Sequence, residues 1–132
     1  MRKYTIWLVL FLSALCFGQT KYPQDYFQSP LGIPLVLAGT FGELRSNHFH
    51  AGIDIKTQLR QGFPVYSIAE GTVTRIKISH WGYGKAIYIA HPSGHTSVYA
   101  HLQKFSPDIE AYVKKAQYAK ESFEIELFPD YG

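Results

Sequence analysis

Cysteine is almost missing from this sequence: Cys16 is the single one among 132 residues. A lone cysteine excludes a framework of disulfides within the chain. Because Cys16 also lies in the N-terminal segment that we expect to be removed, the remaining chain has no thiol nucleophile and no thiolate ligand. Any metal site must therefore be built from histidine and carboxylate side chains.

Strong charge and long apolar runs are missing as well. The formal net charge is +3, and Arg2 and Lys3 supply two of these charges, which leaves +1 for the rest of the chain. That balance gives no basic field for nucleic acid or for an anionic membrane surface. The apolar run from Ile6 to Phe17 is shorter than the ~20 residues that span a bilayer. We therefore expect no nucleic-acid partner and no membrane span.

Residues 1–18 instead have the order of a secretory signal peptide. Arg2 and Lys3 form a short cationic start before the apolar run, and Gly18 supplies a small residue before the expected cleavage point. A lipoprotein signal does not fit, because Leu15 is large where a small residue should precede the cysteine. The expected location is the periplasm, the cell envelope or the outside of the cell.

The body of the chain favours β structure, with 16% aromatic residues and several short alternating runs. After an irregular lead over residues 19–34, strands are expected at 35–38, 65–69, 72–78, 85–91 and 96–102. Turns at 70–71 and 92–95 would join the last four of these into two hairpins. In the final strand Ser97, Tyr99 and His101 alternate with apolar residues, which predicts a one-sided antiparallel sheet with a polar face.

The tail changes character after Phe105. Ser106, Pro107 and Asp108 are typical of a helix start, since they offer a hydroxyl cap, a proline in the first turn and a carboxylate near the positive helix end. An apolar stripe at helical spacing follows, made of Ile109, Tyr112, Val113 and Ala116. Beyond Ser122, alternation of apolar residues and glutamates predicts one more strand. The fold expected is mainly β with one C-terminal helix.

The run from His48 to Asp54 is the densest group of ligand-type residues. His50 and Asp54 offer an imidazole and a carboxylate, which zinc binds at ~2.0–2.2 Å. Four residues of straight strand would cover ~13 Å, so the backbone must bend if both side chains are to reach one ion. Gly52 permits such a bend and, with Ile53, disfavours a helix. A polar loop with incidental histidines is the alternative.

The other histidines are weaker candidates. His101 is expected on the polar strand face, either facing a site or bonded to a neighbour. His91 is expected to make a structural hydrogen bond, while His80 and His95 are expected to face solvent.

Four ordered motifs together resemble the lysostaphin/LytM family of zinc metallopeptidases, over roughly Leu35 to Phe105. They are His48-Phe49-His50-Ala51-Gly52-Ile53-Asp54-Ile55, then Gly62 to Val73, then Gly82-Tyr83-Gly84, and last Tyr99-Ala100-His101-Leu102. The resemblance implies that His50 and Asp54 are the first two ligands of a Zn²⁺ ion and that His101 is a catalytic histidine. It also implies an antiparallel LytM-type sheet and peptidoglycan peptides as the substrate. His48 receives no catalytic role.

One part of the family pattern is missing. The family's later His-x-His motif supplies the third zinc ligand, but no histidine occurs between Leu102 and Gly132. His91 and His95 are poor substitutes because they belong to the expected hairpin. We therefore expect a partial, C-terminally truncated domain over 35–132, with a helix–strand insertion at 106–128. Because a catalytic zinc usually keeps three protein ligands, this chain by itself is expected to be inactive or nearly so.

Two other classes of protein share part of this pattern. A non-catalytic LytM-like regulator or wall-binding module would keep the fold and lose ligands, yet both ligands of the first motif are present. A biotinyl or lipoyl carrier shares the hairpin pattern of residues 62–73, but it needs a lysine at the turn tip, and residues 70–71 supply none.

Overall fold

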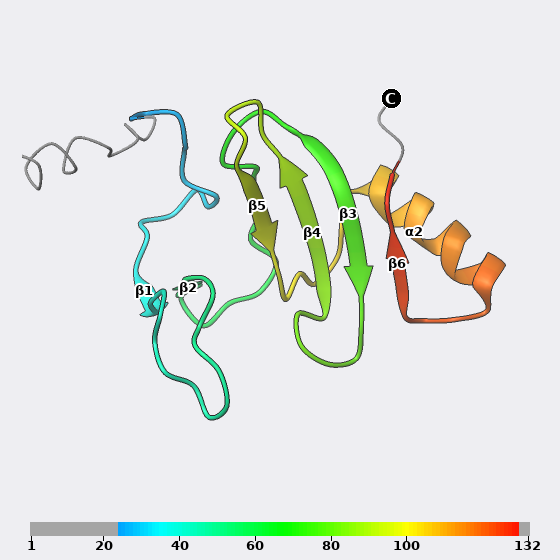
Figure 1. Cartoon of the computed structure of the whole chain (residues 1–132), viewed down its shortest axis with the longest axis horizontal. Coiled ribbons are helices and arrows are strands. Elements are labelled where there is room, and N and C mark those ends of the chain that lie inside the picture. The colour runs from blue at the N-terminus through cyan, green and yellow to red at the C-terminus, as the bar shows by residue number, and fades with distance from the viewer. Residues whose placement is uncertain (1–23, 130–132) are drawn as a thin grey trace, which may run out of the picture.

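The computed structural model describes residues 24–129, which form two antiparallel sheets and one helix (Figure 1). The mainly β fold with one C-terminal helix is thus confirmed, while the expected signal peptide at 1–18 lies outside the described residues. In chain order the elements are β1 (Leu37–Gly39), β2 (Asp54–Ile55), β3 (Thr72–Ile78), β4 (Lys85–Ala90), β5 (Thr96–Tyr99), α2 (Pro107–Lys120) and β6 (Ile125–Leu127).

The larger sheet has the order β5-β4-β3-β6, and each neighbouring pair is antiparallel. The predicted hairpin between β4 and β5 is confirmed. Its turn is closed by His91, whose N–H donates to the carbonyl of His95 at 2.9 Å and whose carbonyl accepts from Gly94 at 2.9 Å. Gly94 has φ +81°, a conformation that glycine adopts without steric cost.

The first predicted hairpin is wrong, because residues 65–69 form no strand and β3 begins directly after Gly71. Both edges of β3 are already hydrogen-bonded, one to β4 and the other to β6. The segment instead bonds to the lead: Tyr66 donates to the carbonyl of Pro30 at 2.9 Å, and Ile68 accepts from Gln28 at 2.7 Å. The segment therefore bonds to the lead and does not form a strand of the sheet.

The core lies between the larger sheet and α2, which covers one face of it near β3 and β6 (Figure 1). Its buried members are Ile76, Ile78, Ile87, Phe105, Val113 and Ile125. Most of the predicted helix stripe faces this core, since Val113 is 1% exposed and Ile109 and Ala116 pack against it. Tyr112 does not belong to the buried stripe, as it is 46% exposed.

Both ends of α2 follow local chemistry. Ser106 is the N-cap residue and Pro107 opens the first turn, but the Ser106 hydroxyl makes no capping hydrogen bond; its carbonyl accepts from the Glu110 N–H at 2.8 Å. At the other end Glu121 has φ +50° and donates its N–H to the carbonyls of the last turn. That left-handed residue ends the helix, after which β6 alternates as predicted, with Ile125 turned inward.

The polar face predicted for β5 is wrong in one respect. Tyr99 packs against the core, and its hydroxyl accepts from the Ile68 N–H at 2.8 Å and from the Ser97 hydroxyl at 3.1 Å. Val98, expected on the buried side, is 45% exposed. The hydroxyls of Ser97 and Tyr99 satisfy one another and nearby groups, so these polar side chains occupy the inner face of the sheet.

We predict that Ile76→Ala lowers the free energy of unfolding by about 2–4 kcal/mol, because it leaves a cavity in the core. Val98→Ala should change it by less than about 0.5 kcal/mol, since that side chain lies on the open face. Urea denaturation followed by circular dichroism measures both. A larger loss for Val98→Ala than for Ile76→Ala would reverse the assignment of the two faces.

A second prediction concerns Glu110, whose carboxylate accepts hydrogen bonds from the Phe105 N–H at 3.1 Å and from Lys85 at 3.3 Å. The first bond, then the ion pair, hold the pKa of Glu110 below its usual range. Such a group stabilises the fold above its unfolded pKa and loses that effect as pH falls through its folded pKa. Glu110→Gln should therefore cost about 1 kcal/mol at pH 7, with the difference shrinking below about pH 4.

Stability curves of Glu110→Gln and the wild type between pH 3 and pH 8 measure this difference. Glu70→Gln is the matched control, since its side chain is exposed. A constant difference across the range would show that the charge of Glu110 contributes nothing.

Candidate metal centre

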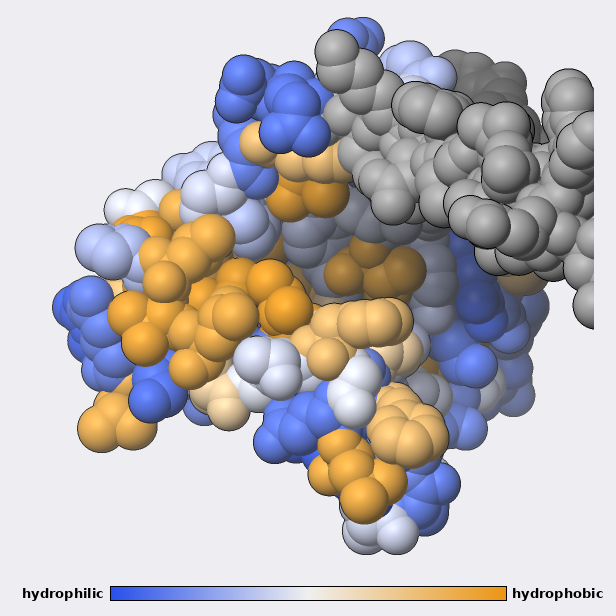
Figure 2. All heavy atoms as spheres, turned by 60° about the vertical axis from the view of Figure 1, so that its left-hand side comes forward, coloured by the Kyte–Doolittle hydropathy of each residue, from blue (hydrophilic) through white to orange (hydrophobic). Residues whose placement is uncertain are grey.

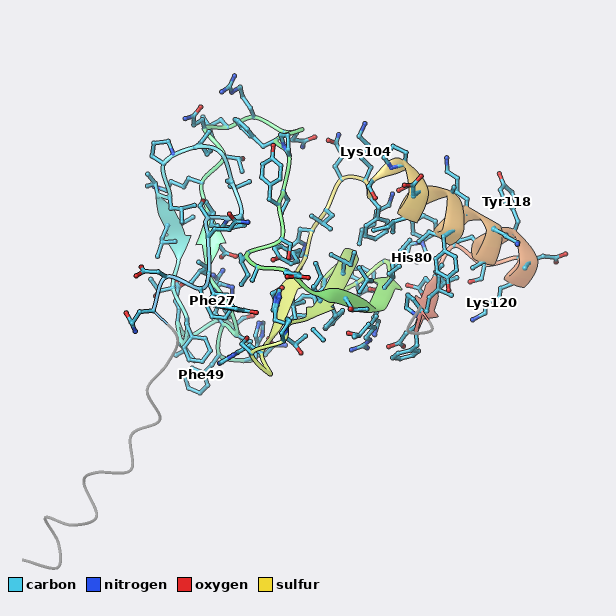
Figure 3. All side chains as sticks on the ribbon, turned by 90° about the horizontal axis from the view of Figure 1, so that it is seen from above. Phe27, Phe49, His80, Lys104, Tyr118 and Lys120 are labelled. Atoms are coloured by element: carbon cyan, nitrogen blue, oxygen red, sulfur yellow. The ribbon has the colours of Figure 1, made fainter. Side chains whose placement is uncertain are left out.

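Asp54 lies on a small two-stranded ribbon, β1 with β2, beside the larger sheet, and His50 lies in the loop that joins the two strands (Figure 1). Gly39 pairs with Asp54 and Leu37 with Ile55. Figure 2 brings this end of the molecule forward and shows apolar side chains gathered on its surface. Phe49 belongs to this end and is 69% exposed, whereas Tyr118 and Lys120 lie on α2 at the opposite end (Figure 3).

A loop between the two strands holds the backbone of His50. Leu44 and Phe49 form an isolated antiparallel bridge. His50 donates its N–H to the Glu43 carbonyl at 2.8 Å and accepts at its own carbonyl from Gly42 at 2.8 Å. The loop is therefore a short, irregular hairpin, and His50 is fixed on its returning arm.

The backbone bends at Gly52, as the spacing required, and this bend brings His50 and Asp54 together. Their side chains face one another, with His50 Nε2 3.3 Å from Asp54 Oδ1. On the other side of the ring, His50 Nδ1 lies 3.0 Å from the carbonyl oxygen of Thr40. The structure thus joins the two predicted ligands through adjacent donor atoms.

The Thr40 carbonyl selects the tautomer of His50. A carbonyl oxygen only accepts, so this hydrogen bond requires the proton on Nδ1. In the neutral ring Nε2 then carries a lone pair and faces Oδ1, a second acceptor. Two acceptors at this distance repel unless a proton or a metal cation lies between them, and fixing the ring through its other nitrogen is how proteins orient metal-binding histidines.

Arg45 completes the cluster and was missed by the sequence analysis. Its Nη2 donates to Asp54 Oδ2 at 2.6 Å and to Glu43 Oε2 at 3.1 Å, and lies 3.3 Å from His50 Nδ1. The hydrogen bond to Asp54 is the main reason why the pKa of Arg45 is raised above its usual value. A sequence signal existed: Arg45 is the sole lysine or arginine between Lys21 and Lys56.

Gly39 leaves the space that the cluster occupies. A Cβ atom at this position would lie 2.5 Å from Arg45 Nη2, 2.5 Å from Asp54 Oδ2 and 3.0 Å from Glu43 Oε2. Real Cβ atoms do not approach neighbours so closely, and hence a side chain here would displace the charged groups. The glycine thus leaves room for these side-chain ends, and its backbone angle is not unusual.

His101 is placed differently from the prediction. β5 ends at Tyr99, and His101 has φ +55°, which turns it out of the strand alternation. Its N–H donates to the Tyr83 carbonyl at 2.9 Å, and its exposed ring meets the Tyr83 ring edge-on at 6.5 Å. Within residues 24–129 no hydrogen bond or ion pair joins His101 to His50 or Asp54.

The remaining histidines match their predicted surroundings. His91 is 5% exposed and bonds the Glu70 carbonyl at 2.8 Å and the Ser97 hydroxyl at 2.9 Å. His95 is exposed in the turn, and His80 is exposed beside Glu124, with 2.9 Å between Nδ1 and Oε1. His48 is exposed and bonds Asn47.

The part of the chain that the structure describes holds no group of three or more His, Cys, Asp or Glu side chains suited to a metal ion. Within these residues His50 and Asp54 are therefore a pair of possible donors.

Comparisons with known proteins identify the family of this chain. The model of peptidase family M23 matches residues 48–120, which is more than half of the chain, and the match includes His50, Asp54 and His101. The chain therefore belongs to peptidase family M23, which confirms the LytM-type peptidase predicted from the motifs.

Curated relatives support the same class. Proteins named DD-carboxypeptidase/endopeptidase Mpg, from Neisseria meningitidis serogroup B and Neisseria gonorrhoeae, are 41% identical to this chain over 63 residues. The match covers 48% of this chain but 14% of each relative, so the chain corresponds to a small part of those proteins. No solved structure matches the chain.

We predict that Gly39→Ala disrupts the ribbon, because the new Cβ would displace Arg45 and Asp54. The cost expected from overpacking is about 1–3 kcal/mol, which corresponds to roughly 10–100-fold faster amide exchange where the ribbon opens locally. Hydrogen exchange at the amides of His50 and Lys56 measures it, since both donate to ribbon carbonyls. Gly32→Ala is the control, as a Cβ there would meet nothing within 4 Å. Unchanged exchange in Gly39→Ala would contradict the packing role.

Proposed function

We propose that this chain forms part of a zinc-dependent endopeptidase that hydrolyses peptide bonds in peptidoglycan. His50 and Asp54 would be zinc ligands and His101 a catalytic histidine. The observation that carries the proposal is the pair of facing acceptors, His50 Nε2 and Asp54 Oδ1, which lie 3.3 Å apart. Membership of peptidase family M23 supplies the reaction class.

The pair fits the dimensions of zinc. Two ligand atoms bound tetrahedrally at ~2.0–2.1 Å lie roughly 3.3 Å from one another. An imidazole nitrogen and a carboxylate oxygen are also among the donors that zinc takes in catalytic sites. A bend at Gly52 and a hydrogen bond to Thr40 orient these atoms before any ion arrives, which lowers the cost of ordering them.

Zinc bound here would polarise a substrate carbonyl and acidify a bound water molecule. His50 and Asp54 hold their donor atoms toward one point, and the Thr40 carbonyl keeps the His50 proton away from it. His101 is exposed, so its ring is free to accept and release a proton at a reacting group. Its positive φ is an uncommon conformation of the kind that collects at functional sites.

Two donors do not complete a catalytic site, which usually has three protein ligands. We therefore propose that residues 24–129 hold zinc weakly by themselves and that a third donor must come from atoms outside this pair. The 132-residue chain alone should accordingly show little or no hydrolysis of peptidoglycan.

The proposed setting is the cell envelope or the outside of the cell, reached through the signal peptide predicted at 1–18. Over residues 24–129 the helix content includes nothing long and apolar enough to cross a bilayer. The substrate class rests on the family and on the endopeptidase named among the relatives.

A second candidate is a non-catalytic LytM-like module that binds or regulates wall components. The shortage of ligands favours it, since the described residues contain two donors in place of three. Preservation of both first-motif donors in bonding geometry favours the peptidase instead, because a purely binding module gains nothing from facing acceptors.

We predict that Zn²⁺ shifts the amide signals of Gly52 and Asp54 in a nuclear magnetic resonance titration of the 132-residue chain. His50→Ala and Asp54→Asn should each weaken this binding by at least about 10-fold, because each removes one of two ligands. His95→Ala should leave it unchanged, since His95 is an exposed histidine in the turn between β4 and β5. Binding by His50→Ala equal to that of the wild type would overturn the proposed site.

A further inference from the structure

We infer that Arg45 is a positioning residue for the proposed zinc site: it fixes the Asp54 carboxylate so that Oδ1 faces His50 Nε2. The inference deepens the proposed function and rests on it. Its basis is the choice of atoms that Arg45 contacts, together with the space that Gly39 provides.

Arg45 approaches the atoms that the metal would not use. Its Nη2 donates to Oδ2 of Asp54 at 2.6 Å, whereas Oδ1 is the oxygen that faces His50 Nε2. On the imidazole Arg45 approaches Nδ1, at 3.3 Å, and again not Nε2. Across the described residues no hydrogen bond or ion pair links Arg45 to Oδ1 or to Nε2. The guanidinium therefore binds one side of the cluster and leaves the other side open.

A short bond between a guanidinium and a carboxylate is charge-assisted and stronger than a neutral hydrogen bond. It limits rotation of the Asp54 carboxylate about its terminal bond, which would otherwise exchange the two oxygens. Asp54 has 44% of its side chain exposed, so burial alone does not fix it. Arg45 thus supplies the orientation that packing does not.

Glu43 balances the charge of this arrangement. Nη2 of Arg45 also donates to Glu43 Oε2 at 3.1 Å. With Glu43 and Asp54 ionised, the three side chains carry a net charge of −1, so an incoming cation meets attraction. Without Glu43 the Arg45–Asp54 pair would be neutral.

The position of the guanidinium is built into the loop at some cost. Nε of Arg45 is buried without a hydrogen-bond partner, although the side chain as a whole is 37% exposed. A buried donor without a partner lowers the stability of the fold. The contacts of Nη2 must offset that cost, and Gly39 makes them sterically feasible because a Cβ there would lie 2.5 Å from Nη2.

The rival role for Arg45 is that of a competing cation that occupies the place of the metal. That role requires contact with Asp54 Oδ1 and His50 Nε2, the atoms that would bind zinc. Arg45 instead approaches Oδ2 of Asp54 and Nδ1 of His50. The two roles predict opposite changes in zinc affinity when Arg45 is replaced: removal of a positioning residue weakens zinc binding, whereas removal of a competitor strengthens it.

The test is a Zn²⁺ titration of the 132-residue chain, followed at the amide signals of Gly52 and Asp54, with Arg45→Met, Arg45→Lys and Arg60→Met. Arg45→Met should bind Zn²⁺ roughly 10–100-fold more weakly, the range for loss of an outer-sphere partner of a ligand. Arg45→Lys should be intermediate, since an ammonium restores the charge without the planar fork. Arg60→Met is the matched control, because Arg60 bonds Gln58 and lies over Phe63.

To distinguish a merely structural role of Arg45 from a positioning role, the unfolding temperature of each metal-free variant is measured first. The Zn²⁺ titrations are then run well below that temperature. If structure alone were affected, folded Arg45→Met would keep the wild-type affinity. Equal or tighter binding by Arg45→Met overturns the positioning role, and if His50→Ala still loses binding, the proposed site stands without it. Absence of binding at these amides in the wild type overturns the proposed site and the role of Arg45 together.

Discussion

Pairing on both edges of β3 is the constraint on which the rest of the fold depends. β4 and β6 take the two sides of this strand, and Ile76 and Ile78 project from it into the core. Residues 65–69 must therefore find hydrogen bonds elsewhere, and they find them in residues 28–30. The helix–strand tail is held to the same strand through β6, so its removal would uncover Ile76 and Ile78.

The candidate site depends on a second and weaker constraint, the pairing of Gly39 with Asp54 in a two-stranded ribbon. An isolated ribbon is marginal in water, and this one leaves several large apolar side chains exposed. Its charged cluster adds order: Arg45 links Glu43, before the loop tip, to Asp54 on β2. The groups that would bind metal thus also hold the two arms of the ribbon together.

The sequence predicted what short-range chemistry determines. The bend at Gly52, the turn at 92–95, the start of α2 near Ser106 and the alternation in β6 all depend on neighbouring residues. It failed where the outcome depends on distant partners: the missing strand at 65–69, the inward face of Tyr99, and the left-handed His101. Arg45 and Gly39 were missed for the same reason, because their roles appear when β1 and the loop meet Asp54.

The incomplete ligand set and the weak ribbon have a common consequence for function. Metal that binds the folded ribbon and not its open form stabilises it in proportion to occupancy. With two donors the proposed zinc occupancy would be low; with a third donor, binding and ordering would reinforce one another. Arg45 and Thr40 reduce the ordering of side chains that metal binding would still require, because they orient Asp54 and His50 before a metal binds. In the proposed function, pre-orientation of two ligands would therefore be the contribution of this segment, and catalysis would depend on the donor that completes the site.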